Sequence, residues 1–85
     1  EDIFKGTITH SHIYTREIIK GALRNNATSI VCIHNHPSGN PNPSDADIEI
    51  TKKIKDSCET IGIVLHDHII IGNNQYFSFK DKELI

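Results

Sequence analysis

The feature that most constrains the fold is a polar, proline-rich run between two apolar segments. Residues 34–47 (HNHPSGNPNPSDAD) contain two histidines, three prolines and two aspartates, with almost no apolar side chain. They follow a short continuous apolar segment, residues 28–33 (TSIVCI), which predicts a strand buried on both faces. They lead into residues 44–60, where apolar side chains recur at helical spacing, at Ile50, Ile54, Cys58 and Ile61. The sequence therefore predicts a buried strand, a stiff loop and an amphipathic helix.

The segments before this run predict a strand and a helix. Residues 3–9 (IFKGTIT) alternate roughly and carry β-branched side chains, which is typical of a strand. Residues 15–26 predict a helix whose apolar side chains fall on one side. Thr15 is an acceptable N-cap for that helix, and the pair Asn25-Asn26 supplies its stop.

The segments after the run predict two strands joined by a tight turn. Residues 63–71 and 75–79 are apolar and β-branched or aromatic, and Gly72-Asn73-Asn74 between them has the chemistry of a hairpin turn. The complete order is β-α-β-loop-α-β-β. It predicts an α/β layer structure, with a small mixed β-sheet flanked by helices.

Length, charge and cysteine content narrow the class of protein. The chain has 85 residues, enough for one small domain. Its net charge is -2 with acidic and basic residues interspersed, which argues against an autonomous nucleic-acid-binding surface. No apolar run could span a membrane and no signal peptide is evident. Cys32 and Cys58 are too few for a disulfide scaffold, so we expect buried thiols in a reducing, cytoplasmic compartment.

Two histidines stand at the mouth of the loop. Residues i and i+2 of an extended chain point to the same face, and Pro37 biases His36 toward that extended conformation. Two adjacent imidazoles make half of a zinc site. A His-x-His pair alone is a weak signal, and two solvent-facing loop histidines are the commoner explanation for it.

Ser44 and Asp47 allow two interpretations that are compatible. A serine followed three residues later by an acid opens many helices as a capping box. An aspartate in the first helical turn can also project toward the strand end that carries the histidines. Two histidines and an aspartate with an open fourth position are typical of a catalytic zinc site. Three prolines stiffen the loop between the histidines and Asp47, namely Pro37, Pro41 and Pro43. A stiff loop lowers the entropy cost of holding these side chains together.

The complete spacing resembles a known family. His34-x-His36, seven residues, Ser44, two residues and Asp47 is similar to the metal-binding core of the JAMM (MPN+/JAB) metalloprotease fold, which has a cytidine-deaminase-like architecture. The surrounding sequence resembles its RadC-like branch over nearly the whole chain, including TREIIKGALRNNATSIVCIHNHPSG, LHDHIIIG and YFSF. The resemblance implies one RadC-like JAB/MPN domain over residues 1–85, lacking its first strand or strands.

The resemblance also implies a chemistry. It implies Zn²⁺ held by His34, His36 and Asp47 with a water as fourth ligand, and Ser44 hydrogen-bonded to the polarised carbonyl or oxyanion. The family reaction is zinc-assisted hydrolysis of an amide or isopeptide bond in a peptide-type substrate. The family's glutamate general base is expected on a strand that precedes Glu1, outside this chain. Within the chain, Glu17 is a weak substitute, since the helix dipole already favours an acid there.

The remaining histidines predict lesser roles. Residues 10–12 (HSH) lack a suitably spaced acid and predict a solvated strand end or loop. His66 and His68 should share one face of a strand, with Asp67 on the other. The RadC-like branch carries an Asp-His pair here, so Asp67 and His68 are candidates for orienting a metal ligand, although a structural histidine is the commoner case. His66 stays unassigned.

Two other functions compete with the hydrolase. Some relatives of this fold are inactive interaction modules, but those typically lose the histidines or the acid that this chain keeps. The family's historical name suggests a role in DNA repair, which the charge pattern does not support. A truncated sheet should also expose a strand edge, through which we expect pairing with a second copy. The substrate itself is left open.

Overall fold

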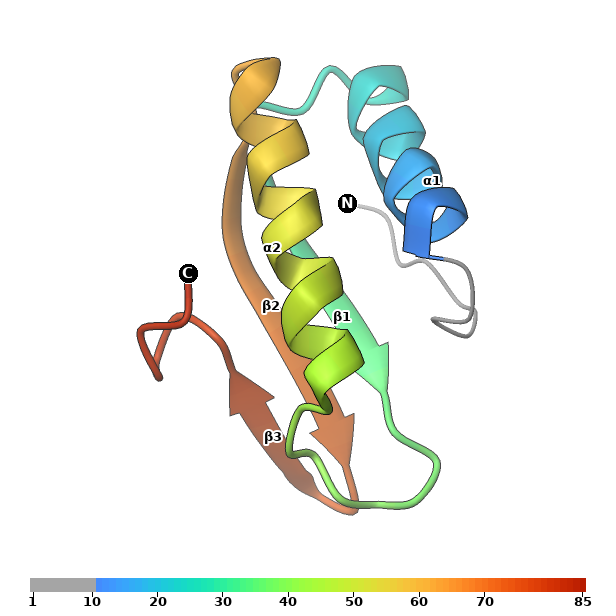
Figure 1. Ribbon diagram of the computed structural model, residues 1–85, viewed down its shortest axis with the longest axis vertical. Helices are drawn as coiled ribbons and strands as arrows, with labels where there is room; N and C mark the ends of the chain where they lie inside the picture. The colour runs from blue at the N-terminus through green and yellow to red at the C-terminus, as the bar shows by residue number, and fades with distance from the viewer. Residues whose placement is uncertain (1–10) are drawn as a thin grey trace.

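The computed structural model describes residues 11–85, which form a three-stranded sheet and two helices (Figure 1). The strands lie in the order β1-β2-β3, with β1 and β2 parallel and β2 and β3 antiparallel. The mixed sheet is therefore confirmed, whereas the strand predicted at residues 3–9 lies outside the described residues. In chain order the elements are α1 (Ser11–Arg24), β1 (Ser29–Asn35), α2 (Asp45–Thr60), β2 (Val64–Gly72) and β3 (Gln75–Ser78).

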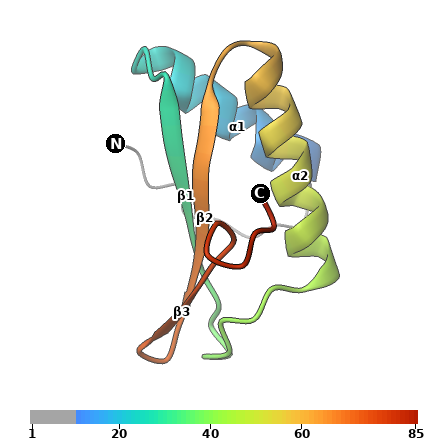
Figure 2. The ribbon, with the colours of Figure 1, turned by 90° about the vertical axis from the view of Figure 1, so that its left-hand side faces the viewer.

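Both helices lie on the same side of the sheet. The helix α2 lies across one face, and α1 lies beside α2, on the β1 side of the sheet (Figures 1 and 2). Between them and the sheet lies the apolar core, which consists of Tyr14, Ala22, Cys32, Ile50, Ile54, Cys58, Ile63 and Leu65. Neither helix of residues 11–85 combines the length and the apolar character needed to cross a membrane.

The beginning of α1 differs from the prediction. The helix begins at Ser11, so Thr15 is not its N-cap, and residues 11 and 12 are helical and not a strand end or loop. The hydroxyl of Thr15 is buried and has no hydrogen-bond partner among the described residues. Tyr14 explains the difference, because it is only 3% exposed and belongs to the core. Packing of this earlier turn outweighs a local capping signal.

The end of α1 confirms the predicted stop. Asn26 has a left-handed backbone (φ 52°), and its N–H donates to the carbonyl of Leu23 at 3.1 Å. The N–H of Ala27 donates to the carbonyl of Ala22 at 2.9 Å, which completes a Schellman motif. Asparagine tolerates the left-handed conformation better than other residues with a side chain, so the helix ends here.

The strand β1 is buried on one face and not on both. Cys32 is 4% exposed, whereas its neighbours Val31 and Ile33 are 40% and 37% exposed. The prediction failed because, among residues 11–85, helices cover only one face of the sheet (Figure 2). Within the described sheet the strand also lies at the edge. Pairing with a second copy through that edge stays a prediction.

The helix α2 closely follows its prediction. Ser44 is its N-cap, and the stripe residues Ile50, Ile54 and Cys58 are buried. Ile61 is the exception, because it is the C-cap residue and is 45% exposed. Both cysteines are buried free thiols, as predicted.

The β2–β3 hairpin supports the histidine-bearing loop. Asn73 and Asn74 both have positive φ (47° and 62°), as a two-residue hairpin turn requires, so the predicted turn is confirmed. A Cβ added to Gly72 would lie 2.7 Å from the carbonyl oxygen of Gly39. The loop backbone therefore rests directly against the end of β2, at the point where Gly39 turns with φ 87°.

Candidate metal centre

The two loop histidines meet at the end of β1. His34 lies within the strand and His36 just after it, and their ring centroids are 4.7 Å apart at an interplanar angle of 87°. The backbone N–H of His36 donates to the carbonyl of Ile71 at 2.9 Å. This bond continues the pairing with β2 one residue past the strand, which keeps both imidazoles on the same side.

Asp47 comes to the same place from the start of α2. Its Oδ2 accepts the backbone N–H of Ser44 at 2.8 Å, and its own N–H donates to Ser44 Oγ at 3.0 Å. These two bonds form the complete capping box that the spacing predicts. Because Ser44 Oγ acts here as an acceptor, its hydroxyl proton remains available for another partner.

The three side chains form a group that could hold a metal ion. One ligand atom from each of His34, His36 and Asp47 lies within 4.8 Å of the others. His36 Nε2 is 3.0 Å from Asp47 Oδ2, and His34 Nδ1 is 3.6 Å from Asp47 Oδ1. Asp47 is 3% exposed, so the carboxylate is largely withdrawn from water. Two imidazole nitrogens and a carboxylate are the donor set of many catalytic zinc sites.

The hydrogen bonds of the group fit a bound cation. His36 Nδ1 is 2.8 Å from the carbonyl oxygen of Asn40, which can only accept, so Nδ1 carries a proton. A neutral His36 then turns an unprotonated Nε2 toward Asp47 Oδ2, and a proton or a metal ion must separate these two atoms. His34 Nδ1 is buried and has no hydrogen-bond partner in the described part of the chain, which leaves it available as a ligand. A ligating histidine that donates its other N–H to a carbonyl is the usual arrangement at metal sites.

The local electrostatics favour the protonation states that bind metal. Burial lowers the pKa of His34 below its ordinary value, so the imidazole is neutral near pH 7. Burial alone would raise the pKa of Asp47, but the Ser44 hydrogen bonds and the two nearby imidazoles outweigh it and hold that pKa below its usual range. A neutral imidazole and an ionised carboxylate are the forms that act as ligands.

Behind the group lie Thr51 and His68. Thr51 Oγ1 donates to the carbonyl of Asp47 at 2.7 Å and is 2.6 Å from His68 Nδ1. His68 is fully buried, and burial lowers its pKa to about 4. His68 thus lies near His34 and, through Thr51, near Asp47, while an orienting role for it stays a prediction. Thr51 was missed, although its place one helical turn after Asp47 was a usable signal.

Asp67 points elsewhere. Its carboxylate accepts the N–H of His68 at 2.7 Å, the hydroxyl of Ser78 at 2.6 Å and the N–H of Lys80 at 3.0 Å. These bonds attach β2 to the end of β3 and to the segment after it. The side chain of Asp67 therefore stabilises the sheet, and its contacts lead away from the two ligand histidines. An orienting role for Asp67 stays a prediction.

His66 and His68 have different surroundings despite their spacing. The register between β1 and β2 shifts at this point, since Ile30 pairs with Leu65 and Val31 pairs with Asp67. His66 is the extra residue in β2 and has no partner on β1. It is exposed, whereas His68 is buried, so the expected shared face does not form.

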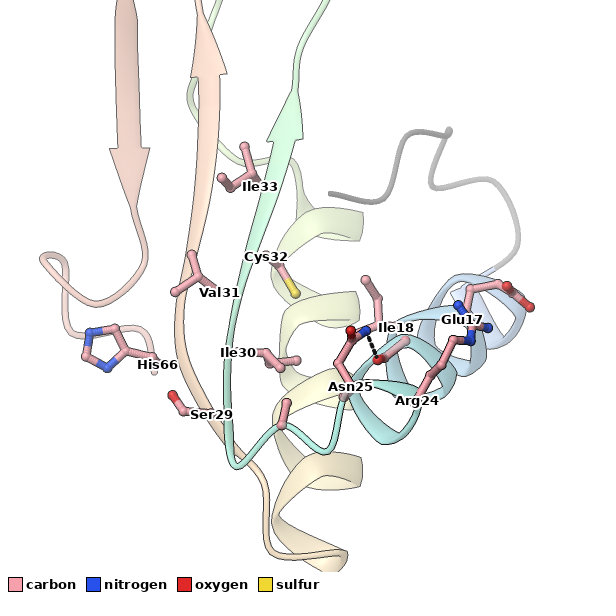
Figure 3. A pocket seen from close by; sticks show the side chains of 13 residues that line it. Glu17, Ile18, Arg24, Asn25, Ser29, Ile30, Val31, Cys32, Ile33 and His66 are labelled. Carbon is pink, nitrogen blue, oxygen red and sulfur yellow. Dashed lines mark hydrogen bonds between the residues drawn. The ribbon is translucent and has the colours of Figure 1, made fainter. Parts of the chain in front are cut away.

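Glu17 lies apart from the three-residue group. It forms an ion pair with Lys20 at 3.5 Å and lines a groove of about 800 Å³ between α1 and β1 (Figure 3). That groove does not include His34, His36 or Asp47. A role for Glu17 as general base therefore has no support from its contacts and stays a prediction. The other groove residues are Ile18, Gly21, Ala22, Arg24, Asn25, Ala27, Ser29, Ile30, Val31, Cys32, Ile33 and His66.

The fold and the three-residue group together define a small mixed α/β domain with a candidate metal centre. Comparison with known proteins identifies the family. The family model described as "RadC-like JAB domain" matches residues 1–84, and the chain belongs to this family. The observed sheet and helices are consistent with a JAB/MPN domain.

Curated relatives support the same assignment. The chain is 55% identical over 80 residues to a UPF0758 protein of Streptococcus agalactiae and 52% identical over 85 residues to one of Clostridium beijerinckii. A UPF0758 protein of Ruegeria pomeroyi is 46% identical over 80 residues. These matches cover 94%, 100% and 94% of the chain but only 35%, 37% and 36% of the relatives. The chain thus spans about a third of the length of the curated relatives it matches.

Proposed function

We propose that this chain is the zinc-binding domain of a RadC-like metallohydrolase that cleaves an amide or isopeptide bond. The observation that carries the proposal is the convergence of His34, His36 and Asp47 from two different elements at the end of β1. His36 Nδ1 against the Asn40 carbonyl adds support, because that contact turns Nε2 toward the carboxylate. The donor set distinguishes zinc from Mg²⁺ or Ca²⁺, which prefer oxygen ligands.

Each residue has a defined part in this proposal. These three side chains would hold the zinc ion, whose chemistry would be to activate a water and polarise the scissile carbonyl. His34 and His36 donate ring nitrogens, and Asp47 donates a carboxylate oxygen while its other contacts hold the start of α2. Ser44 Oγ accepts the Asp47 N–H, and its hydroxyl proton would be available to hydrogen-bond the substrate oxygen.

A metal-binding module without hydrolase activity is the second candidate. Among residues 11–85, the group at the ligand site contains no acid other than Asp47, which is itself a ligand candidate. A hydrolase additionally needs a general base within reach of the water. The full-length protein must supply that base for the first candidate to hold.

Metal analysis tests the site directly. We expect about one zinc per chain in the purified protein and a sharp loss in His36→Ala, because truncation removes one of three protein ligands. His66→Ala is the matched control, since His66 is an exposed histidine of β2 outside the group. Full zinc retention in His36→Ala, with a folded protein by circular dichroism, would contradict the proposal.

Hydrolysis separates the two candidates. Full-length protein should cleave a panel of fluorogenic peptide and isopeptide conjugates, and Ser44→Ala should lower kcat by about 10²-fold if its hydroxyl stabilises the oxyanion. Zinc binding without turnover of any conjugate would favour the interaction module.

A further inference from the structure

We propose that Thr51 and His68 are positioning residues that hold two ligands of the metal site, Asp47 and His34, in place. The proposal rests on the proposed zinc site, because it concerns how that site is held and not whether it exists. Neither residue is a ligand candidate. Both are buried behind the group, with Thr51 at 1% and His68 at 0% exposure.

Thr51 connects the two elements that meet behind the site. Its hydroxyl lies 2.7 Å from the carbonyl oxygen of Asp47 and 2.6 Å from His68 Nδ1. Thr51 and Asp47 belong to the first turns of α2, whereas His68 belongs to β2. The chain Asp47–Thr51–His68 therefore ties the beginning of α2 to the central strand of the described sheet.

One arrangement of protons satisfies both contacts. A hydroxyl has a single proton, and the Asp47 carbonyl can only accept, so Thr51 donates to Asp47. His68 Nδ1–H must then donate to Thr51 Oγ1, which fixes the ring as the Nδ1–H tautomer. His68 Nε2, on the other side of the ring, has no hydrogen-bond partner among residues 11–85. A buried imidazole with one fixed donor therefore orients the threonine hydroxyl toward the carbonyl of Asp47.

The ring of His68 also supports His34. Its centroid is 5.0 Å from that of Phe79 at an interplanar angle of 12°, and 6.2 Å from that of His34 at 29°. The three rings form a stack that runs from the core to the candidate ligand. His34 Nδ1 has no hydrogen bond among residues 11–85, so packing against the rings of His36 and His68 helps to limit its rotation.

Simple core filling does not account for this pair. Two apolar side chains would fill the same space without the desolvation cost that buried polar groups carry, a cost that their hydrogen bonds must offset. The same helix provides a comparison, because Thr60 Oγ1 donates to the carbonyl of Asp56 at 2.9 Å but is exposed. Thr60 makes the same kind of bond to the helix backbone but contacts no buried histidine among residues 11–85. A comparison of variants at Thr60 and Thr51 therefore separates the effect of losing the backbone bond from the effect of losing the contact with His68.

Zinc affinity with a matched control tests the proposal. We expect Thr51→Val to weaken the zinc Kd by about tenfold, because loss of a contact that orients a ligand typically costs 10–100-fold. Thr51→Ser should restore most of the affinity, since it keeps the hydroxyl. Thr60→Val removes an equivalent backbone bond near the other end of α2 and should leave Kd unchanged.

Two further readouts separate positioning from stability. In the cobalt-substituted protein, Thr51→Val should alter the visible ligand-field absorption, which reports donor geometry, while Thr60→Val should not. His68→Phe keeps a ring in the stack but removes the Nδ1–H donor. The double variant with Thr51→Val should therefore lose less affinity than the product of the two single losses.

The outcomes are distinguishable. A wild-type protein that binds no zinc overturns the proposed function itself. Wild-type binding together with an unchanged Kd and cobalt spectrum in a folded Thr51→Val protein overturns only the positioning role. Failure of Thr51→Ser to restore binding also overturns it, because the hydroxyl would then not be the relevant group.

Discussion

The two faces of β1 serve different purposes. On the face toward α2, Cys32 is buried and His34 follows it into the candidate metal centre. On the opposite face, Val31 and Ile33 are 40% and 37% exposed, with no helix over them in the described part of the chain. Alternate residues of one strand thus face either the packed core and the candidate metal centre beside it, or an open surface.

The difference shows what determines the geometry of the site. The helix-facing side is held from three directions: by α2 through Asp47, by β2 through His68, and by the hairpin through the contact of Gly72 with Gly39. The opposite side has no comparable constraint among residues 11–85. Substitutions on the two sides should therefore differ in kind, and paired variants can test this.

The largest difference is expected in stability. Ile54, at 0% exposure on α2, faces the sheet, and Ile54→Ala should lower the free energy of unfolding by about 4 kcal/mol. Val31→Ala on the open face should cost less than about 0.5 kcal/mol. Urea denaturation of both variants measures the two values. Equal losses would mean that something covers the open face in solution.

A second difference concerns pH. The unfolded chain titrates its histidines near the ordinary pKa of about 6.5, whereas burial lowers the pKa of His68 to about 4 in the folded state. As the pH falls between these values, the unfolded state takes up the proton first, so the metal-free protein should lose up to about 3 kcal/mol of stability. His34 acts in the same direction, because burial also lowers its pKa.

The histidine pair on β2 provides the control for that prediction. His68→Gln should flatten the dependence of stability on pH between about 6.5 and 4. His66→Gln, at the exposed neighbouring position, should leave the dependence as it is in the wild type. Chemical denaturation at a series of pH values gives both curves, and a wild-type stability that stays constant across this range would refute the assignment of a buried, neutral His68.

The smallest expected effect concerns the loop support. Gly72→Ala places a Cβ 2.7 Å from the Gly39 carbonyl oxygen, so the loop backbone must shift and the zinc Kd should weaken by about tenfold. Gly62→Ala is the control: Gly62 has φ 76° and open space around it, so it should cost about 1 kcal/mol of stability with no change in Kd. Identical zinc titrations for Gly72→Ala and wild type would show that this contact does not support the site.

Local chemistry made much of the site predictable. The capping box of Ser44 and Asp47, the extended His34 and His36, and the Asn73-Asn74 turn each depend on neighbours in the sequence, and each is present. Spacing therefore suggested a ligand group as one of two compatible interpretations of this segment, and the resemblance to the JAMM fold singled out His34, His36 and Asp47 as its implied ligands.

Other features depend on partners far away in the sequence. The start of α1 is set by the burial of Tyr14, and the exposure of Val31 depends on which face the helices cover. The separation of His66 from His68 requires the register shift against β1. The contact between Thr51 and His68 joins residues 17 apart. No local pattern encodes such contacts, so they emerge only in the folded chain.

Asp47 has a structural role as well as a place in the candidate metal site, and this should affect how the site evolves. Its carboxylate caps α2 through Ser44 and also faces both histidines, so a substitution that removes the candidate ligand also loosens the beginning of a core helix. Selection for a stable fold would then act against loss of the aspartate, even in a relative that did not use the candidate metal site. His34 and His36 do not cap a helix, so in such a relative they should be substituted before Asp47 is.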